Sequence, residues 1–109
     1  LSSTAAPSPP SSRRTLRAGD VAEKKLRLTA SMVTQYCHLT GDANPIHVDE
    51  AFARAQGFER CLVPGTLLLA FVAGLVGSDL PGPGTLLLQK GAKFLHPVYV
   101  GDCLLYTSD

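Results

Sequence analysis

The sequence has little net charge, few cysteines and no tryptophan. Among its 109 residues, ten lysines and arginines are balanced by nine acids, which gives a net charge of +1. Nucleic-acid-binding proteins usually carry a dominant excess of lysine and arginine, so this composition argues against a nucleic-acid partner. The three cysteines lack CxxC spacing. They therefore indicate neither a disulfide framework nor a thiolate metal site, and they are typical of a reducing compartment.

The sequence also lacks an apolar run long enough to span a bilayer, so no membrane partner is predicted. The most apolar stretch, Leu62 to Val76, has about fifteen residues, whereas a membrane span needs about twenty. We predict a helix from about Gly65 to Gly77 that begins beside Pro64, because proline is tolerated in the first turn of a helix. Since this helix is apolar on nearly every side, it should be surrounded by other parts of the protein.

Residues 1–19 differ in composition from the rest of the chain. They are rich in serine, alanine and proline, and they contain Arg13, Arg14 and Arg17 but no acid. This composition is typical of a mitochondrial transit peptide, although the prolines would interrupt an amphipathic helix. The alternative is a disordered leader or low-complexity linker. Residues 20–109, with the apolar content of a compact core, are predicted to form one domain.

Local signals predict the remaining elements. A short strand is expected over residues 20–28, and a helix over residues 30–39 should be capped by Thr29 and ended by Gly41. A second, short helix should follow Asp49 and end at Gly57. In it, Ala51, Phe52 and Ala55 are expected to face inward. After the turn "LPGPG" at residues 80–84, two strands interrupted near Gly91, Pro97 and Gly101 are predicted.

The stretch "TGDANPIHV", residues 40–48, places an acid and an imidazole five positions apart with a proline between them. Proline has no backbone N–H and disfavours the helical conformation of the residue before it. Asp42 and His47 should therefore lie on a shaped turn rather than on one helix. A carboxylate and an imidazole held about one water apart can together take up and return a proton.

The longer run "LTGDANPIHVDEAFARAQGF" resembles the signature of the MaoC-like, R-specific enoyl-thioester hydratases, a Gly-Asp-x-Asn-Pro-aliphatic-His pattern followed by an acid, an alanine-rich helix and Gly-Phe. The similarity continues through "LVPG" and the apolar helix to "PVYVGD", so it covers residues 19–101. The leader and the "LPGPG" turn are most similar to the mitochondrial hydroxyacyl-thioester dehydratases of type 2 within that family. Pro64 stands where relatives often have histidine.

Carried over to this sequence, the resemblance implies a catalytic pair, Asp42 and His47. It also implies that Asn44 and Pro45 shape the turn and contribute to substrate binding, and that the backbone N–H of Gly65 is the oxyanion donor. The implied fold is the α+β hot-dog, an antiparallel sheet wrapped around a long apolar helix. This chain has too few strand-like segments for that sheet, so we expect the C-terminal strands to be incomplete or supplied by a partner.

The implied activity is the reversible dehydration of (R)-3-hydroxyacyl thioesters to trans-2-enoyl thioesters, in fatty-acid synthesis and in the mitochondrial matrix. The substrate would be carried on coenzyme A or on acyl carrier protein, the enzyme would use no cofactor, and it would act as a homodimer. The alternative is a non-catalytic hot-dog module that binds an acyl thioester or pairs with a complete subunit. The sequence favours neither thioester carrier.

Metal sites are not predicted. Acidic and amide side chains at residues 42, 44, 49 and 50 suggest a calcium loop, but Pro45 and a missing glycine break the EF-hand spacing. A catalytic zinc ion needs more than one nearby histidine. His38 is predicted to be a surface residue and His96 a structural one. The basic residues that could meet a phosphate are scattered, which is typical of solvated surface; they are Arg54, Arg60, Lys90 and Lys93.

Overall fold

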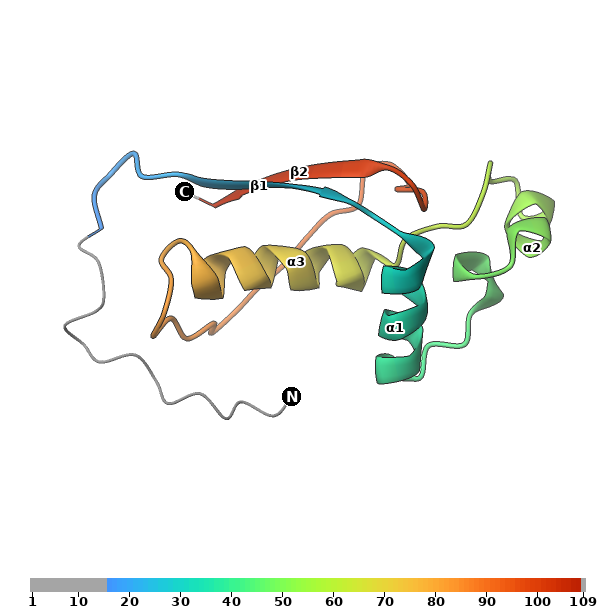
Figure 1. Cartoon of the computed structure of the whole chain (residues 1–109), viewed down its shortest axis with the longest axis horizontal. Helices are drawn as coiled ribbons and strands as arrows, with labels where there is room; N and C mark the ends of the chain where they lie inside the picture. The colour runs from blue at the N-terminus through green and yellow to red at the C-terminus, as the bar shows by residue number, and fades with distance from the viewer. Residues whose placement is uncertain (1–15, 109) are drawn as a thin grey trace.

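The computed structural model describes residues 16–108, so most of the predicted leader, residues 1–15, lies outside the described residues. Within them the chain forms, in order, β1, α1, the 3-10 turn η2, α2, α3 and β2 (Figure 1). The α+β class agrees with the prediction. The described strands, however, form a two-stranded sheet, which covers one side of the long helix instead of wrapping around it.

The two strands pair antiparallel. β1 (Ala22–Arg27) lies beside β2 (Cys103–Ser108), with Ala22 opposite Ser108 and Arg27 opposite Cys103. The pairing continues beyond the strand ends, because the N–H of Leu28 donates to the carbonyl of Asp102 and the N–H of Gly101 donates to the carbonyl of Leu28. The strand predicted over residues 20–28 is therefore confirmed, and its end is fixed to the turn that precedes β2.

α1 (Ala30–Thr40) begins and ends where the sequence predicted. The hydroxyl of Thr29 accepts a hydrogen bond from the N–H of Met32 at 3.2 Å, which satisfies one of the first-turn donors. Gly41 has a φ of 76°, the left-handed conformation that glycine adopts without strain. The helix therefore stops directly before the turn that carries Asp42.

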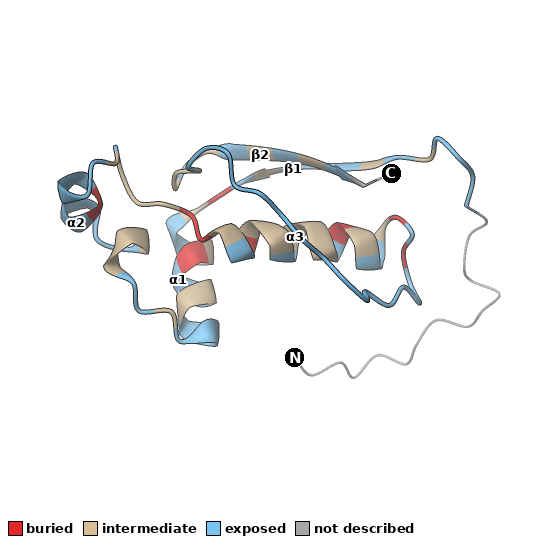
Figure 2. Ribbon diagram, turned by 180° about the vertical axis from the view of Figure 1, so that it is seen from behind, coloured by how far each residue is buried: buried red, intermediate tan, exposed pale blue. Residues whose placement is uncertain are grey.

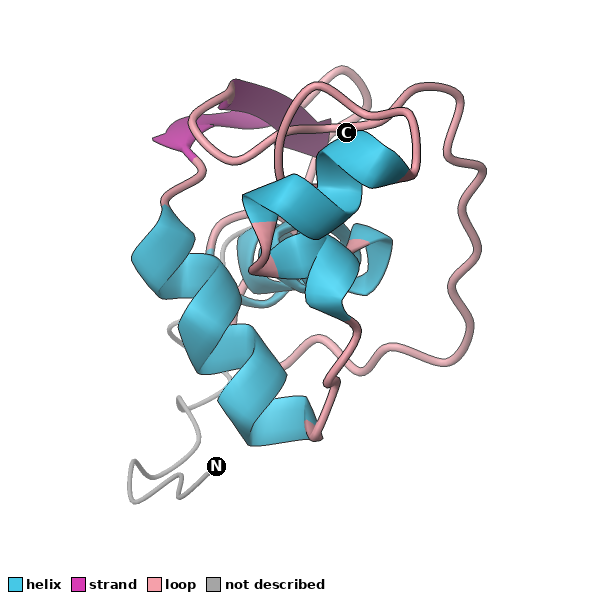
Figure 3. Ribbon diagram, turned by 90° about the vertical axis from the view of Figure 1, so that its right-hand side faces the viewer, coloured by secondary structure: helices cyan, strands magenta, loops and turns pink. Residues whose placement is uncertain are grey.

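α3 (Gly65–Ser78) is the predicted apolar helix. It lies beneath the β1–β2 pair, and α1 crosses near its N-terminal end (Figures 1 and 3). The core lies at this junction, where buried residues from both helices and from the flanking segments meet; they are Leu28, Val33, Val63 and Leu67. Within residues 16–108, no helix has the length and hydropathy of a membrane span.

Residues 85–97, called the crossing segment here, were predicted to form a strand, and this prediction is wrong. The segment has no regular secondary structure, and Leu86 and Leu88 are largely exposed. It crosses α3 obliquely rather than running beside a strand (Figure 2). A strand needs a neighbouring strand to pair its N–H and carbonyl groups, and this segment joins neither β1 nor β2 in the sheet.

α2 (Glu50–Ala55) follows η2 (Pro45–His47) and packs against it. The carboxylate of Asp49 caps α2 by accepting the N–H of Phe52 at 3.1 Å, as the sequence predicted. The predicted inner face is wrong, because Ala53 is the buried residue, whereas Phe52 and the alanines at 51 and 55 are exposed. A helix of six residues makes less than two turns, so it has few positions on any one face.

Candidate active site

The turn between α1 and α2 is built from side chains that bond to the local backbone. The Asp42 carboxylate accepts the N–H of Asn44 at 3.0 Å, and the side-chain oxygen Oδ1 of Asn44 accepts the N–H of Ile46 at 3.2 Å. Such Asx turns are a short-range alternative to a helix. Pro45 is the first residue of η2. Proline is tolerated there because a backbone N–H at this position would have no acceptor within the turn. The turn brings residues 42 and 47 to the same side of the chain.

The side chains of Asp42 and His47 face each other. His47 Nε2 lies 3.6 Å from Asp42 Oδ2, and the two side chains are 12% and 33% exposed, respectively. This separation is longer than a direct hydrogen bond. A small molecule beside the pair can nevertheless lie within hydrogen-bond distance of both atoms. The two groups are therefore placed to share one water.

The backbone fixes the orientation of the His47 ring. Nδ1 lies 2.8 Å from the carbonyl oxygen of Leu62. A carbonyl only accepts hydrogen bonds, so Nδ1 is the donor, and in the neutral imidazole Nε2 carries the free lone pair. That lone pair is on the nitrogen that faces Asp42. This tautomer gives the pair a proton acceptor directed at the shared water.

Leu62 is itself held in place by a short backbone pairing. Segments 61–63 and 98–100 are linked by hydrogen bonds of 2.7 and 3.0 Å, and a bridge joins Leu62 to Tyr99. The N–H of Leu62 also donates to the carbonyl of Ile46 at 3.1 Å. These bonds tie the segment before α3 to the turn that carries His47.

Gly65, the first residue of α3, lies at the same place. It lines a cavity of about 380 Å³ together with the facing pair, the segment before the helix and the end of the crossing segment; the lining residues are Asp42, His47, Leu62, Val63, Pro64, Gly65, Thr66, Leu68, Phe94, His96, Pro97 and Val98. The first N–H groups of a helix have no intrahelical acceptor. Among the described residues, none accepts a hydrogen bond from the Gly65 N–H.

The ring of Phe94 covers Gly65 closely. A Cβ atom built at position 65 would lie 2.7 Å from the ring Cζ, closer than such atoms approach in proteins. Only glycine therefore fits at this position with the ring where it lies. The crossing segment thus contributes one wall of the cavity, although the strand predicted there does not form.

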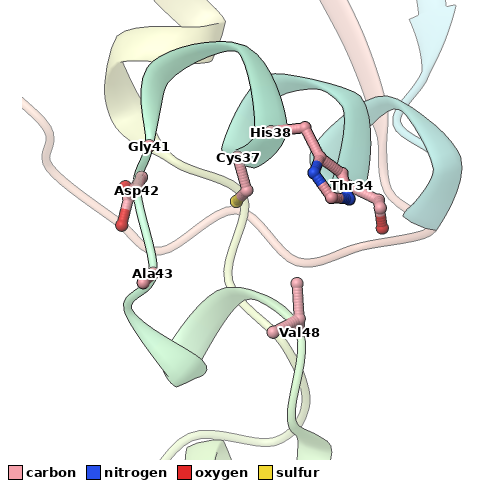
Figure 4. Close-up of a pocket in the computed structure, with 7 residues that line it drawn as sticks. All are labelled: Thr34, Cys37, His38, Gly41, Asp42, Ala43 and Val48. Carbon is pink, nitrogen blue, oxygen red and sulfur yellow. The ribbon is translucent and has the colours of Figure 1, made fainter.

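A second hollow of about 500 Å³ lies on the other side of Asp42, between α1 and the turn (Figure 4). Here the His38 ring and the Asp42 carboxylate point apart. Burial, followed by the negative charge of Asp42, raises the pKa of Cys37 above its ordinary value, so that this thiol stays neutral near neutral pH. This hollow therefore presents neither a reactive thiolate nor a second group facing the acid, and the candidate site is the cavity around His47.

Of the five residues singled out from the sequence, Asp42, His47 and Gly65 line the cavity, whereas Asn44 and Pro45 lie in the turn between Asp42 and His47 and do not line it. The cavity also includes residues that were not singled out. His96, predicted to be structural, lines the cavity. Arg60, predicted to be solvated, bonds to Asp102. The backbone carbonyl of Leu62 and the ring of Phe94 had no sequence signal, because both contacts depend on tertiary structure. Among residues 16–108, no three metal-binding side chains lie close enough together to hold an ion.

Comparison with known proteins gives consistent relatives. The MaoC-like domain family model matches residues 15–108. The (R)-specific enoyl-CoA hydratase of Aeromonas caviae is 41% identical over 91 residues, which are 84% of this chain and 68% of the relative. A mitochondrial 3-hydroxyacyl-acyl-carrier-protein dehydratase of Solanum lycopersicum is 34% identical over 87 residues, covering 80% of this chain and 52% of the relative.

Solved structures agree with these sequence matches. The structure of the (R)-hydratase from A. caviae superposes with a TM-score of 0.81 at 38% identity, over 86% of this chain and 71% of that one. The α+β arrangement described above therefore matches part of a hot-dog hydratase. This chain spans 64% of the length of the Rhodospirillum rubrum hydratase and 50% of a 3-hydroxybutyryl-CoA dehydratase of Methylorubrum extorquens. The chain belongs to the MaoC-like family of (R)-specific enoyl-CoA hydratases and hydroxyacyl dehydratases.

Proposed function

We propose that this chain catalyses the reversible hydration of trans-2-enoyl thioesters to (R)-3-hydroxyacyl thioesters. The observation that carries the proposal is the pairing of Asp42 with His47, 3.6 Å apart, in a cavity that also contains the start of α3. The named hydratases and dehydratases among its relatives support the same reaction class.

In the proposed reaction, Asp42 and His47 hold the attacking water. The carboxylate accepts one hydrogen bond from it, and His47 Nε2 takes its other proton as the oxygen bonds to the β-carbon of the substrate. The electron pair of the carbon–carbon double bond moves toward the thioester and forms an enolate. The imidazolium then returns its proton to the α-carbon, which restores the neutral ring. Proton transfers of this kind contribute about a hundred- to ten-thousand-fold in rate.

The Gly65 N–H is the proposed donor to the thioester oxygen. It is free to donate among the described residues and lies at the positive end of the α3 dipole. Charge accumulates on the thioester oxygen only as the enolate forms, so a donor fixed at that point stabilises the transition state more than the substrate. Asn44 and Pro45 act in this scheme through the turn that places the acid and the base.

The acyl chain has a proposed place along α3. A cavity of about 310 Å³ lies between the helix and the crossing segment, lined mainly by Leu69, Val72, Ala73, Val76 and Leu87. Each methylene buried there would stabilise the complex by about 0.8 kcal/mol. Names of relatives include both coenzyme A and acyl carrier protein substrates, so an assay with both carriers of one acyl chain is needed to distinguish them.

The proposal is tested by crotonyl-CoA hydration, followed through the loss of enoyl-thioester absorbance. Asp42→Asn and His47→Ala should each lower kcat/KM by at least about a hundredfold, because each removes one of the two groups that hold the water. The exposed His38 on α1 provides a matched control, and His38→Ala should retain the wild-type rate. Equal rates in the wild type, Asp42→Asn and His47→Ala would eliminate the proposed function.

The second candidate is a module that pairs with another subunit. It is favoured by the apolar, exposed part of the crossing segment, where Leu86, Leu88 and Leu95 face solvent. Exposed apolar patches of this kind commonly mark protein interfaces, and the proposed enzyme would also bury them as a homodimer. Light scattering of the purified chain distinguishes a monomer from a dimer. An inactive chain that gains activity only with a complete subunit would favour the second candidate.

Action in the mitochondrial matrix, in fatty-acid synthesis, is also part of the proposal. Its support is the composition of residues 1–19 and the two plant relatives whose names are mitochondrial. The test is microscopy of the chain fused at its C-terminus to a fluorescent protein, compared with a fusion that begins at residue 20. Loss of mitochondrial signal in the shorter fusion is expected. Equal distributions would argue against a targeting role for the leader.

A further inference from the structure

Arg60 was predicted to be a solvated surface residue, but in the structure its guanidinium contacts three other residues. Its Nη2 donates to Asp102 Oδ1 at 2.8 Å and its Nε donates to the carbonyl oxygen of Val100 at 3.1 Å. The guanidinium also lies over the ring of Tyr99, 5.0 Å from its centre. A planar guanidinium can make these contacts simultaneously, whereas the single ammonium of a lysine cannot. Arg60 therefore attaches the chain before α3 to the turn before β2.

Asp102 extends the attachment. Its second oxygen, Oδ2, accepts the N–H of Tyr99 at 2.9 Å. This one carboxylate thus holds both the guanidinium of Arg60 and the backbone at residue 99. Residue 99 is the bridge partner of Leu62, and the carbonyl of Leu62 accepts the Nδ1–H of His47 at 2.8 Å. A continuous series of contacts leads from the guanidinium to the catalytic imidazole.

We infer that Arg60 and Asp102 are positioning residues, which hold the Leu62 carbonyl where it selects the Nδ1–H tautomer of His47 and directs Nε2 at Asp42. This role rests on the proposed function only for its effect on rate. The effect on the tautomer is a property of the free protein.

Burial distinguishes this role from a purely structural one. The side chains of Arg60 and Asp102 are 41% and 37% exposed. Ion pairs exposed to this extent contribute little to folding free energy, because water already solvates both charges. If the pair positions His47, breaking it should change the tautomer of the His47 ring while the protein stays folded. The pair formed by Lys24 and Asp79, 3.4 Å apart and also partly exposed, is a matched control far from His47.

The test measures the ring nitrogens of His47 directly. In the ¹⁵N-labelled whole chain, two-bond ¹H–¹⁵N spectra of the neutral imidazole report which nitrogen carries the proton. The wild type and Asp79→Asn should show the Nδ1–H tautomer. Arg60→Ala and Asp102→Asn should show a mixture of tautomers, with kcat for crotonyl-CoA hydration lowered about tenfold and KM nearly unchanged. Arg60→Lys keeps the positive charge but loses the planar guanidinium that donates to both Asp102 and Val100, so it should also show a mixture of His47 tautomers.

The outcomes separate the two proposals. If Arg60→Ala fails to fold, Asp102→Asn, which keeps the shape of the side chain, still gives the answer. A wild-type tautomer pattern in Asp102→Asn overturns the positioning role, whatever the activity. If the wild type lacks hydratase activity while the ring pattern still changes in the variants, the proposed function fails and the positioning role is supported.

Discussion

Substitution of Gly65 by alanine gives the sharpest test of the proposal that the N–H of this residue is the oxyanion donor. The added methyl group would lie 2.7, 2.8 and 3.0 Å from three atoms of the Phe94 ring, so either the ring or the helix must move. The ring is the far end of a flexible side chain that is 56% exposed. We expect the ring to rotate into solvent and the backbone of α3 to remain in place. The methyl group would then occupy the cavity directly beside the N–H of residue 65.

The change in stability should be small. Alanine gains up to about 1 kcal/mol over glycine in a helix. Displacing the half-exposed Phe94 ring loses about 1 kcal/mol, roughly half of what burying a whole phenylalanine contributes. The free energy of unfolding should therefore change by less than about 1 kcal/mol. The rate should fall far more, because the methyl group would keep the thioester oxygen away from the N–H of residue 65, and an oxyanion that lacks one donor costs about a hundred- to a thousandfold in kcat.

The assay compares crotonyl-CoA hydration with urea unfolding for Gly65→Ala and for a control in the same helix, Gly74→Ala. At position 74 an added Cβ meets nothing within 4 Å, so the control should gain up to about 1 kcal/mol in stability and retain full activity. Wild-type kcat/KM in a folded Gly65→Ala chain would refute the assignment of the Gly65 N–H as the oxyanion donor.

Three further predictions concern stability. Leu28→Ala removes a fully buried side chain from the core and should lower the free energy of unfolding in urea by about 2–5 kcal/mol; a change below 1 kcal/mol would place the core elsewhere. Thr29→Ala removes the cap of α1 and should cost about 1 kcal/mol in the same assay, whereas Thr34→Ala, on the exposed side of the helix, should not destabilise the protein. Burial raises the pKa of Cys37 and Cys61 above the ordinary value of 9.0, and nearby carboxylates add to the effect. Because the unfolded thiols ionise first, their contribution to stability is present at neutral pH and is lost as the pH rises above 9.0; a chain with both cysteines replaced by serine should lack this part of the decline.

Features set by short-range chemistry were predicted well. Thr29 and Asp49 cap the helices that follow them, and Gly41 and Gly57 adopt positive φ where those helices end. Each of these features depends on atoms within a few residues, so the local sequence determines it. The opposition of Asp42 and His47 was predicted from the same kind of signal, because the intervening turn is held by its own side chains.

Features set by long-range contacts were predicted less well. The crossing segment has the composition of a strand, but a strand also requires an edge to pair with, which its own residues do not specify. The acceptor for His47 is a backbone carbonyl fifteen positions away, and any residue type supplies a carbonyl. The pairing of Arg60 with Asp102 spans 42 positions. In these cases the sequence shows the functional groups, but it does not show which of them meet in the folded protein.

The backbone pairing of segments 61–63 and 98–100 has a consequence for the order in which the site forms. Both side chains assigned to the reaction precede residue 97, but the backbone groups that hold the neighbours of Leu62, at residues 61 and 63, come from residues 98 and 100. Synthesis on the ribosome proceeds from the N-terminus to the C-terminus, so the acid and the base emerge well before the backbone that orients them. A nascent chain that has emerged only as far as residue 97 would contain the acid and the base without the backbone pairing that orients the imidazole, so we expect the site to form only after residues 98–100 have emerged.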